Sequence, residues 1–367
     1  MLAGFFGAVS SHLLIALVAT SLVVTPTNVY AASASSQGLV NLQKTIESYV
    51  NSINGTQNLD LPLKNKSLPS SKKPVGSSRQ SDQATVVNFN QDQLNNIIAA
   101  AYFSDATYAD NSDISNWTCG TACSNPLVTG TNVTLVWNDQ NPSTKGYIAK
   151  NDARRVILIA FEGSDTAESW LDNLQVELVR FPLRSTGSAT WGRAHEGFSE
   201  AASLPYSEYK DQFVALANEN PGYDVLVTGH SRGAAIGQLF VALLANEYPE
   251  LKPRLNMITF GQPRVGNEDL AQYINRQGIK TALRVVDQSD IVPHLPPEFL
   301  GYRHPNRELW IRERPRDKYE LVLCALSTTD AGSGCPQAGQ LDVVVNGVRD
   351  HSIDNYIKYL MEIPISN

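Results

Sequence analysis

The sequence predicts an α/β protein in which helices cover both faces of a mostly parallel central sheet. Strand-like and helix-like segments alternate from about residue 88 to the end of the chain, and this alternation is typical of parallel sheets. Residues 156–161 form a continuous apolar run, as expected for a strand buried on both faces. Around Ser231, an apolar strand leads through a sharp turn directly into a helix. Together these observations favour the α/β class.

The expected elements follow in chain order. Residues 92–103 are predicted to form a helix because their apolar side chains recur on one side. The other expected elements are strands at 131–137, 146–148, 255–260, 282–286, 309–311 and 319–323, and helices at 198–218, 233–244, 267–276 and from residue 351 onward. No internal repeat and no clear linker interrupts this series. We therefore expect one domain over residues 86–367.

The N-terminal part of the chain differs from this domain. Residues 13–24 are apolar and small residues follow them, so residues 1–31 are predicted to be a secretory signal peptide. No lysine or arginine precedes Lys44, and an uncleaved anchor is the alternative. Residues 32–85 are rich in Ser, Asn, Gln and Lys, which predicts a prosegment or a flexible linker. Apolar residues at helical spacing over 39–53 would allow a short helix there that shields an apolar site.

Composition and charge exclude several classes of partner. The chain has 367 residues, 42% hydrophobic and 18% charged, which is ordinary for a globular protein. Its net charge of −7 comes with no evident basic face, so we expect no nucleic-acid partner and no tight docking on anionic membranes. We expect a monomer that does not remain inserted in a membrane once the signal is removed.

The cysteines agree with an exported protein. They fall in two close pairs, Cys119 with Cys123 and Cys324 with Cys335, and neither spacing is that of a zinc site. Local disulfides are the natural interpretation in an oxidising compartment. Four Asn-x-Ser/Thr sequons fit a secreted glycoprotein and begin at Asn54, Asn65, Asn116 and Asn132.

The chemistry is centred on Ser231. Gly229, Ser231 and Gly233 make the Gly-x-Ser-x-Gly pattern of a nucleophile elbow. A serine on such a turn projects its hydroxyl from the sheet, and the N-terminus of the next helix directs N–H groups toward it. The backbone N–H of Arg232, the next residue, is therefore a candidate donor to the oxyanion of an acyl-transfer reaction.

A serine nucleophile needs a base and an orienting carboxylate, and in the α/β-hydrolase fold these follow it in the order Asp or Glu, then His. His294, His304 and His351 lie downstream of Ser231. His351 is favoured because it follows a strand-like run and a turn and opens the last helix. Asp290 is the expected carboxylate because it follows the strand at 282–286, and Asp287 is its nearby rival.

From about residue 88 onward the chain resembles the fungal class 3 lipases, the triacylglycerol lipases of filamentous fungi. The matching stretches are Ala160–Ser164, Ser169–Leu174, His195–Phe198, Val227–Ser231, Phe260–Asn267, Asp290–Pro297 and Asp350–His351. This resemblance implies an α/β-hydrolase fold and a triad of Ser231, Asp290 and His351. It also implies that Ser164 supplies the second oxyanion donor, through its N–H and its hydroxyl, and that Cys324 pairs with Cys335. No metal or cofactor is implied.

The resemblance and the candidate residues predict a secreted, extracellular serine hydrolase of carboxylic esters. A triacylglycerol lipase that works on lipid or ester substrates at an oil–water interface is the expected activity. A feruloyl-type esterase of the same family and a non-catalytic binding member of the fold are the alternatives, because a fold does not guarantee a chemistry. A serine peptidase is a more distant alternative.

Two further hypotheses concern the rim of the predicted site. Apolar side chains that include Trp170 share one helical face between residues 164 and 176, which would suit a lid that opens on lipid; a fixed surface helix is the alternative. Glu162 and Arg232 stand where the family usually carries Arg and Leu. Two opposite charges arriving together suggest that they form an ion pair, although each side chain could instead reach solvent or a separate partner.

Overall fold

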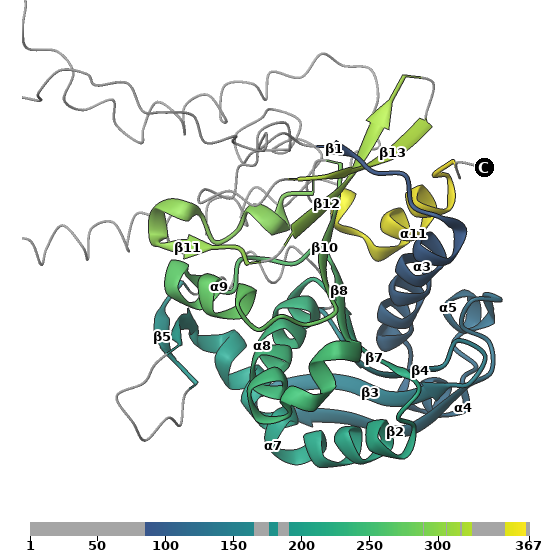
Figure 1. Cartoon of the computed structure of the whole chain (residues 1–367), viewed down its shortest axis with the longest axis horizontal. Coiled ribbons are helices and arrows are strands. Elements are labelled where there is room, and N and C mark those ends of the chain that lie inside the picture. The colour runs from purple at the N-terminus through teal and green to yellow at the C-terminus, as the bar shows by residue number, and fades with distance from the viewer. Residues whose placement is uncertain are drawn as a thin grey trace, which may run out of the picture. The chain divides into compact units, whose positions relative to one another are not determined.

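The computed structural model describes residues 85–164, 176–182, 191–288, 290–305, 307–315, 318–324 and 349–364. Within these residues, the dominant feature is a nine-stranded sheet in the order β1-β13-β12-β10-β8-β7-β4-β3-β2 (Figure 1). Its strands are β1 (Thr85–Val86), β2 (Thr131–Gln140), β3 (Ser143–Asn151), β4 (Val156–Phe161), β7 (Asp224–His230), β8 (Leu255–Phe260), β10 (Thr281–Asp287), β12 (Arg307–Arg314) and β13 (Lys318–Leu323). The predicted signal peptide and prosegment lie outside the described residues.

The middle of this sheet is parallel and its two edges are antiparallel. Neighbouring strands run parallel from β4 through β7, β8 and β10 to β12. The strands β3 and β2 extend the sheet antiparallel on one side, and β13 and β1 do so on the other. The carboxyl ends of the five parallel strands therefore meet at one edge, where open α/β sheets carry their ligand sites.

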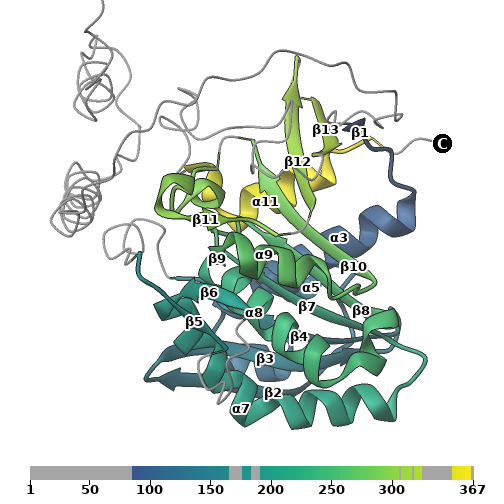
Figure 2. The same cartoon turned by 60° about the vertical axis from the view of Figure 1, so that its left-hand side comes forward.

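Helices cover both faces of the sheet, so the predicted α/β fold is confirmed. The helices α7 (Glu196–Glu219) and α8 (Arg232–Glu247) lie on one face, and α3 (Gln91–Asp105) and α11 (Ile353–Met361) lie on the other (Figures 1 and 2). This arrangement explains why residues 156–161 are all apolar. Alternate residues of this run join the two opposite hydrophobic clusters, and all six are buried.

The remaining elements are short. They are the helices α4 (Asn111–Asn116), α5 (Gly120–Ser124) and α9 (Glu268–Asn275), and the 3₁₀ turns η1 (Ala106–Tyr108), η2 (Pro249–Arg254), η3 (Val292–His294), η4 (Glu298–Leu300) and η5 (Arg349–His351). A small second sheet, which the sequence pattern did not predict, has the order β11-β9-β6-β5 and is built from β5 (Leu178–Phe181), β6 (Gly192–His195), β9 (Gly266–Asn267) and β11 (Tyr302–Arg303). Strands of two to four residues are too short to show a periodicity.

Most predicted boundaries agree with the observed elements to within a few residues. The helix predicted over 92–103 is α3, which begins one residue earlier because Asn90 and Gln93 form a capping box. The helix predicted to open at His351 instead begins at Ile353, because His351 ends the 3₁₀ turn η5. This displacement matters for function, since it leaves His351 on a turn rather than inside the helix.

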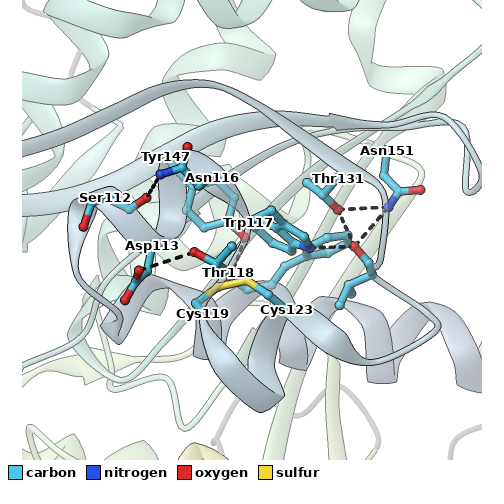
Figure 3. Close-up of a disulfide and its surroundings, with 12 residues drawn as sticks. Ser112, Asp113, Asn116, Trp117, Thr118, Cys119, Cys123, Thr131, Tyr147 and Asn151 are labelled. Atoms are coloured by element: carbon cyan, nitrogen blue, oxygen red, sulfur yellow. Dashed lines mark hydrogen bonds between the residues drawn. A yellow bond between two sulfur atoms is a disulfide. The ribbon is translucent and has the colours of Figure 1, made fainter.

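One predicted local disulfide is confirmed. Cys119 and Cys123 are bonded to each other across α5, beside the indole of Trp117 (Figure 3). The Trp117 Nε1–H donates to the carbonyl of Val128 at 2.9 Å, which ties this loop to the turn before β2. Cys324 is also disulfide-bonded, and its predicted partner Cys335 lies outside the described residues. In the described part of the chain, no helix is long and apolar enough to cross a membrane.

Candidate active site

Ser231 lies on a strained turn between β7 and α8. Its φ of 57° and ψ of −128° lie in a region that side chains other than glycine rarely occupy, and such backbone costs roughly 1–3 kcal/mol. The turn is held by the Ser231 N–H, which donates to the carbonyl of Phe260 at 2.9 Å, and by the Ala234 N–H, which donates to the Ser231 carbonyl at 3.1 Å. This is the geometry of a nucleophile elbow.

The two glycines of the motif are required by close backbone contacts. A Cβ atom at Gly229 would lie 2.7 Å from the carbonyl carbon of Gly233. A Cβ atom at Gly233 would lie 2.6 Å from the carbonyl oxygen of Glu162 and would also overlap that of Phe161. Any side chain at either position would push the strand, the elbow and the loop after β4 apart.

A hydrogen-bonded chain joins Ser231, His351 and Asp290. His351 Nε2 lies 2.8 Å from Ser231 Oγ, and His351 Nδ1 lies 2.9 Å from Asp290 Oδ2. All three side chains are buried, with exposed fractions of 2%, 3% and 0%. Because the Asp290 carboxylate can only accept, Nδ1 carries the proton and Nε2 is left bare toward the Ser231 hydroxyl. The arrangement can therefore remove the serine proton.

The Asp290 carboxylate is held in place by two further donors. The hydroxyl of Tyr356 donates to Oδ2 at 2.5 Å, and the Val292 N–H donates to Oδ1 at 2.8 Å. Burial, together with the nearby negative charge of Asp290, raises the pKa of Tyr356 well above its ordinary value, so this hydroxyl keeps its proton. Sequence reasoning missed Tyr356, because at helical spacing from Ile353 and Leu360 it is indistinguishable from an ordinary core residue.

Gly261 is a second residue that sequence reasoning missed. It follows β8 with a φ of 54°, and a Cβ atom there would lie 2.8 Å from His351 Cε1 and 2.9 Å from Asp290 Oδ2. The backbone of Gly261 therefore packs directly against the His351–Asp290 pair. The family resemblance included the stretch Phe260–Asn267, which contains Gly261, but it did not indicate what Gly261 does.

The rival carboxylate Asp287 is not part of this chain. It ends β10 with no exposed surface, and among the residues that the structure describes neither carboxyl oxygen has a hydrogen-bond partner. Burial, and then the negative charges of Asp290 and Asp350, raise the pKa of Asp287 to about 9. Asp287 is consequently a neutral acid at neutral pH, and it cannot stabilise a charged imidazole as Asp290 can.

The two rival histidines also lie outside the chain. His294 is buried on η3, and His304 Nε2 lies 2.6 Å from the carbonyl oxygen of Pro293, to which it donates. Burial and nearby arginine charges lower the pKa of His304 well below its ordinary value. Neither imidazole is bonded to Ser231 or Asp290, so His351 alone of the three histidines contacts the serine.

The two expected oxyanion donors lie at the start of α8 and on the loop after β4. Arg232 is the first residue of α8, where N–H groups have no partner inside the helix. Ser164 lies on the loop after β4, and this loop packs against the elbow: a Cβ atom at Gly163 would lie 2.9 Å from the carbonyl oxygen of His230 and 3.1 Å from Ser231 Cβ. The loop that carries Ser164 thus packs directly against the nucleophile turn.

The direct ion pair hypothesised between Glu162 and Arg232 is not formed. The Glu162 carboxylate instead contacts Lys145 Nζ at 2.7 Å, and the Arg232 guanidinium donates to the carbonyl of Ser143 at 2.6 Å. Lys145 was missed because it comes beside Glu162 only through the antiparallel pairing of β3 with β4, where the Glu162 N–H donates to the Lys145 carbonyl. Burial lowers the pKa of Arg232, and the Glu162 charge acts on it through space in the opposite direction.

Three other observations complete the description of the site. The predicted lid, with Trp170, lies outside the described residues. Among the residues that are described, no cluster of three or more His, Cys, Asp or Glu side chains could hold a metal ion. A cavity of about 220 Å³ lies at the opposite, amino-terminal edge of the sheet, beside Phe89, Arg154 and Asp224, and contains none of the hydrogen-bonded residues above.

Comparisons with known proteins point to one family. A family model described as lipase (class 3) matches residues 158–300. A lipase of Rhizomucor miehei is 31% identical over 202 residues, which are 54% of this chain and 53% of that protein. A secreted mono- and diacylglycerol lipase of Fusarium solani is 32% identical over 173 residues, 47% of this chain and 49% of that protein. The chain thus matches only about half the length of these curated relatives.

Solved structures agree with these sequence matches. One is a triacylglycerol lipase whose catalytic centre is a serine protease triad. It superposes with a TM-score of 0.62 at 27% identity, over 73% of this chain and 96% of that one. The similarity therefore extends over nearly the whole of a known lipase structure.

Proposed function

We propose that the chain, which matches the class 3 lipase family over residues 158–300, is a member of that family that hydrolyses the carboxylic esters of acylglycerols through acyl transfer to Ser231. The single observation that carries the proposal is the buried chain of hydrogen bonds from Ser231 through His351 to Asp290. A non-catalytic member of the fold would have no need to place these three side chains in contact. The relatives named above act on acylglycerols, which favours lipid esters as the substrate class.

The first half of the reaction acylates Ser231. Ser231 Oγ attacks the ester carbonyl carbon while His351 Nε2 takes the hydroxyl proton. The Asp290 carboxylate holds His351 Nδ1–H and stabilises the imidazolium, and the donors from Tyr356 and Val292 keep that carboxylate oriented. The negative charge that develops on the carbonyl oxygen is stabilised by donors from the start of α8 and from the loop after β4.

The second half releases the acid. His351 passes its proton to the departing alcohol oxygen, so the bond between the carbonyl carbon and that oxygen breaks and the acyl-enzyme remains. Water then attacks the acyl carbon, and His351 accepts a proton from it as it did from Ser231. Collapse of the second intermediate frees the carboxylic acid and returns the proton to Ser231 Oγ.

We assign the oxyanion donors to the N–H of Arg232 and to the N–H and hydroxyl of Ser164. The position of Arg232 at the start of α8 and the packing of the Ser164 loop against the elbow support this assignment.

We further propose that the protein is secreted, in keeping with its secreted relatives and its disulfides. The segment at residues 164–176 would act as the lid that opens at an oil–water interface.

The proposal is tested by an activity panel on the purified protein. We expect fatty acid release from a triacylglycerol emulsion and from p-nitrophenyl esters of rising chain length, with little release of acid from methyl ferulate. Ser231→Ala, which keeps the fold, serves as the control and should lower turnover by roughly 10⁴-fold or more. Hydrolysis of methyl ferulate alone would replace the lipase with a feruloyl esterase, and hydrolysis of none of these esters would remove the catalytic proposal.

A further inference from the structure

His230 is a buried histidine that the steps above leave unused. It ends β7 immediately before Ser231 and is only 5% exposed. Both of its ring nitrogens are nevertheless bonded. His230 Nε2 lies 2.7 Å from the backbone carbonyl oxygen of His351, and His230 Nδ1 lies 2.7 Å from the hydroxyl oxygen of Tyr108. A side chain that only filled the core would have no need of two polar partners.

The partners leave a single arrangement of protons on this ring. The His351 carbonyl can only accept, so Nε2 carries a proton and donates it. Burial, and then the proximity of His351, lower the pKa of His230 well below its ordinary value, so the ring is neutral. A neutral imidazole has only one N–H, which leaves Nδ1 bare to accept from the Tyr108 hydroxyl. The His351 carbonyl therefore selects the tautomer of His230, and the Tyr108 hydroxyl stabilises it by donating to Nδ1.

The ring of His230 also contacts the ring of His351. Their centroids are 4.5 Å apart with 33° between the planes. The backbone of Gly261 contacts the His351–Asp290 pair, as described above. A neutral neighbour suits this position, because a second positive imidazole at this distance would oppose the charge that His351 gains in acyl transfer.

Tyr108 links this arrangement to the loop that carries Ser164. It ends the 3₁₀ turn η1, which follows α3, and a Cβ atom at Gly163 would overlap its hydroxyl. The Tyr108 hydroxyl thus lies between the loop after β4 and the ring of His230, whose other nitrogen contacts the backbone of His351. Segments more than a hundred residues apart in the chain meet at this one oxygen and the ring that it contacts.

We propose that Tyr108 and His230 are positioning residues that act through His351. Tyr108 stabilises the tautomer and the orientation of His230 by donating to Nδ1, and the N–H of His230 holds the backbone of His351, so that the His351 imidazole stays within reach of Ser231 Oγ. This inference rests on the proposed acyl-transfer function, and neither residue touches the substrate. An error of about 1 Å in the position of a catalytic group can lower a rate by roughly 100-fold.

A matched pair of variants tests the donated hydrogen bond. In His230→Gln the amide N–H lies near the position of Nε2 and can still donate to the His351 carbonyl, whereas in His230→Asn the shorter amide cannot reach it. On a soluble p-nitrophenyl ester, we expect His230→Asn to lower kcat by roughly 10- to 100-fold with KM changed less than about twofold. We expect His230→Gln to keep kcat within about threefold of the wild type.

Thermal melting separates this role from simple packing. Equal losses of kcat in His230→Gln and His230→Asn, in proportion to their losses of Tm, would mean that His230 only fills space, and the proposal would be wrong. Tyr108→Phe offers a milder change, for which we expect kcat to fall by roughly 3- to 10-fold at nearly constant KM. An unchanged kcat in Tyr108→Phe would also count against the proposal.

A spectroscopic measurement tests the charge and the tautomer of His230 without an activity assay. In ¹⁵N-histidine-labelled Ser231→Ala protein, nuclear magnetic resonance at neutral pH should show His230 neutral, with a proton on Nε2 and none on Nδ1. In Tyr108→Phe/Ser231→Ala this tautomer should lose its exclusive population. If the wild type hydrolyses esters but His230 is charged or carries its proton on Nδ1, the positioning role fails alone. If the tautomer is as stated but no ester is hydrolysed, the proposed function fails instead.

Discussion

Replacing Asp287 with asparagine should remove part of the pH dependence of stability. In the folded protein, burial and neighbouring carboxylates raise the pKa of Asp287 to about 9, compared with 3.8 for an exposed aspartate. The unfolded chain therefore releases this proton near pH 4, while the folded chain keeps it until near pH 9. Between these values the folded state binds one more proton, so rising pH favours unfolding. Below pH 4, both states hold the proton and the effect vanishes.

The size of the effect follows from one proton. A difference of one bound proton changes the free energy of unfolding by about 1.4 kcal/mol per pH unit. Between about pH 5 and pH 8, the raised pKa of Asp287 should lower the free energy of unfolding of the wild type by up to this amount per pH unit. In Asp287→Asn this contribution is absent, so the variant should gain stability relative to the wild type as the pH rises. The other titrating groups are common to both proteins and cancel in the difference.

Urea denaturation of both proteins at pH 5, 6, 7 and 8 measures this difference. We expect the free energy of unfolding of Asp287→Asn minus that of the wild type to increase steadily across the series. Turnover at pH 7 should stay within a few-fold, because Asp287 bonds none of the reacting groups. Parallel stability curves would show that the pKa of Asp287 is not raised in the folded protein, and would refute its assignment as a neutral buried acid.

The remaining predictions test the surroundings of the site. Lys145→Met should lower the free energy of unfolding by roughly 1–3 kcal/mol, because it leaves the half-buried Glu162 without its cation; addition of Glu162→Gln should recover part of the loss in urea denaturation, and no loss in the single variant would contradict this. Tyr356→Phe removes a donor to Asp290 and should lower kcat by roughly tenfold at constant KM, whereas unchanged steady-state kinetics would make that bond dispensable. Trp170→Ala should impair hydrolysis of emulsions more than of soluble esters, while equal losses with a large fall in Tm would assign Trp170 to the core.

The sequence was sufficient to predict the layers of the fold, because local patterns report them. The apolar run of β4 indicated a strand covered on both faces, and the pattern around Ser231 indicated the turn between β7 and α8. The order of serine, aspartate and histidine along the chain then led to the residues that the structure brings into contact. The sequence favoured Asp290 over Asp287, and the family resemblance implied the same residue; the positions of the two side chains then showed that Asp290 contacts His351.

The features that the sequence did not predict all depend on contacts between distant segments. Lys145 reaches Glu162 only through the register of two antiparallel strands, and so the expected direct pairing of Glu162 with Arg232 is not formed. Tyr108 and His230 are 122 positions apart and meet because η1 lies beside the end of β7. No period or motif in the sequence carries such a contact, since it depends on how elements pack rather than on how they form.

The central claim, that Ser231 is a nucleophile activated by His351, is tested most directly by covalent labelling. A p-nitrophenyl alkylphosphonate reacts with an activated serine and leaves one stable adduct. Mass spectrometry should find one adduct per molecule on the peptide that contains Ser231, formed in step with the loss of esterase activity. Ser231→Ala should not be labelled, and His351→Ala should be labelled far more slowly. A fully labelled protein that keeps its activity, or an adduct on another residue, would contradict the account.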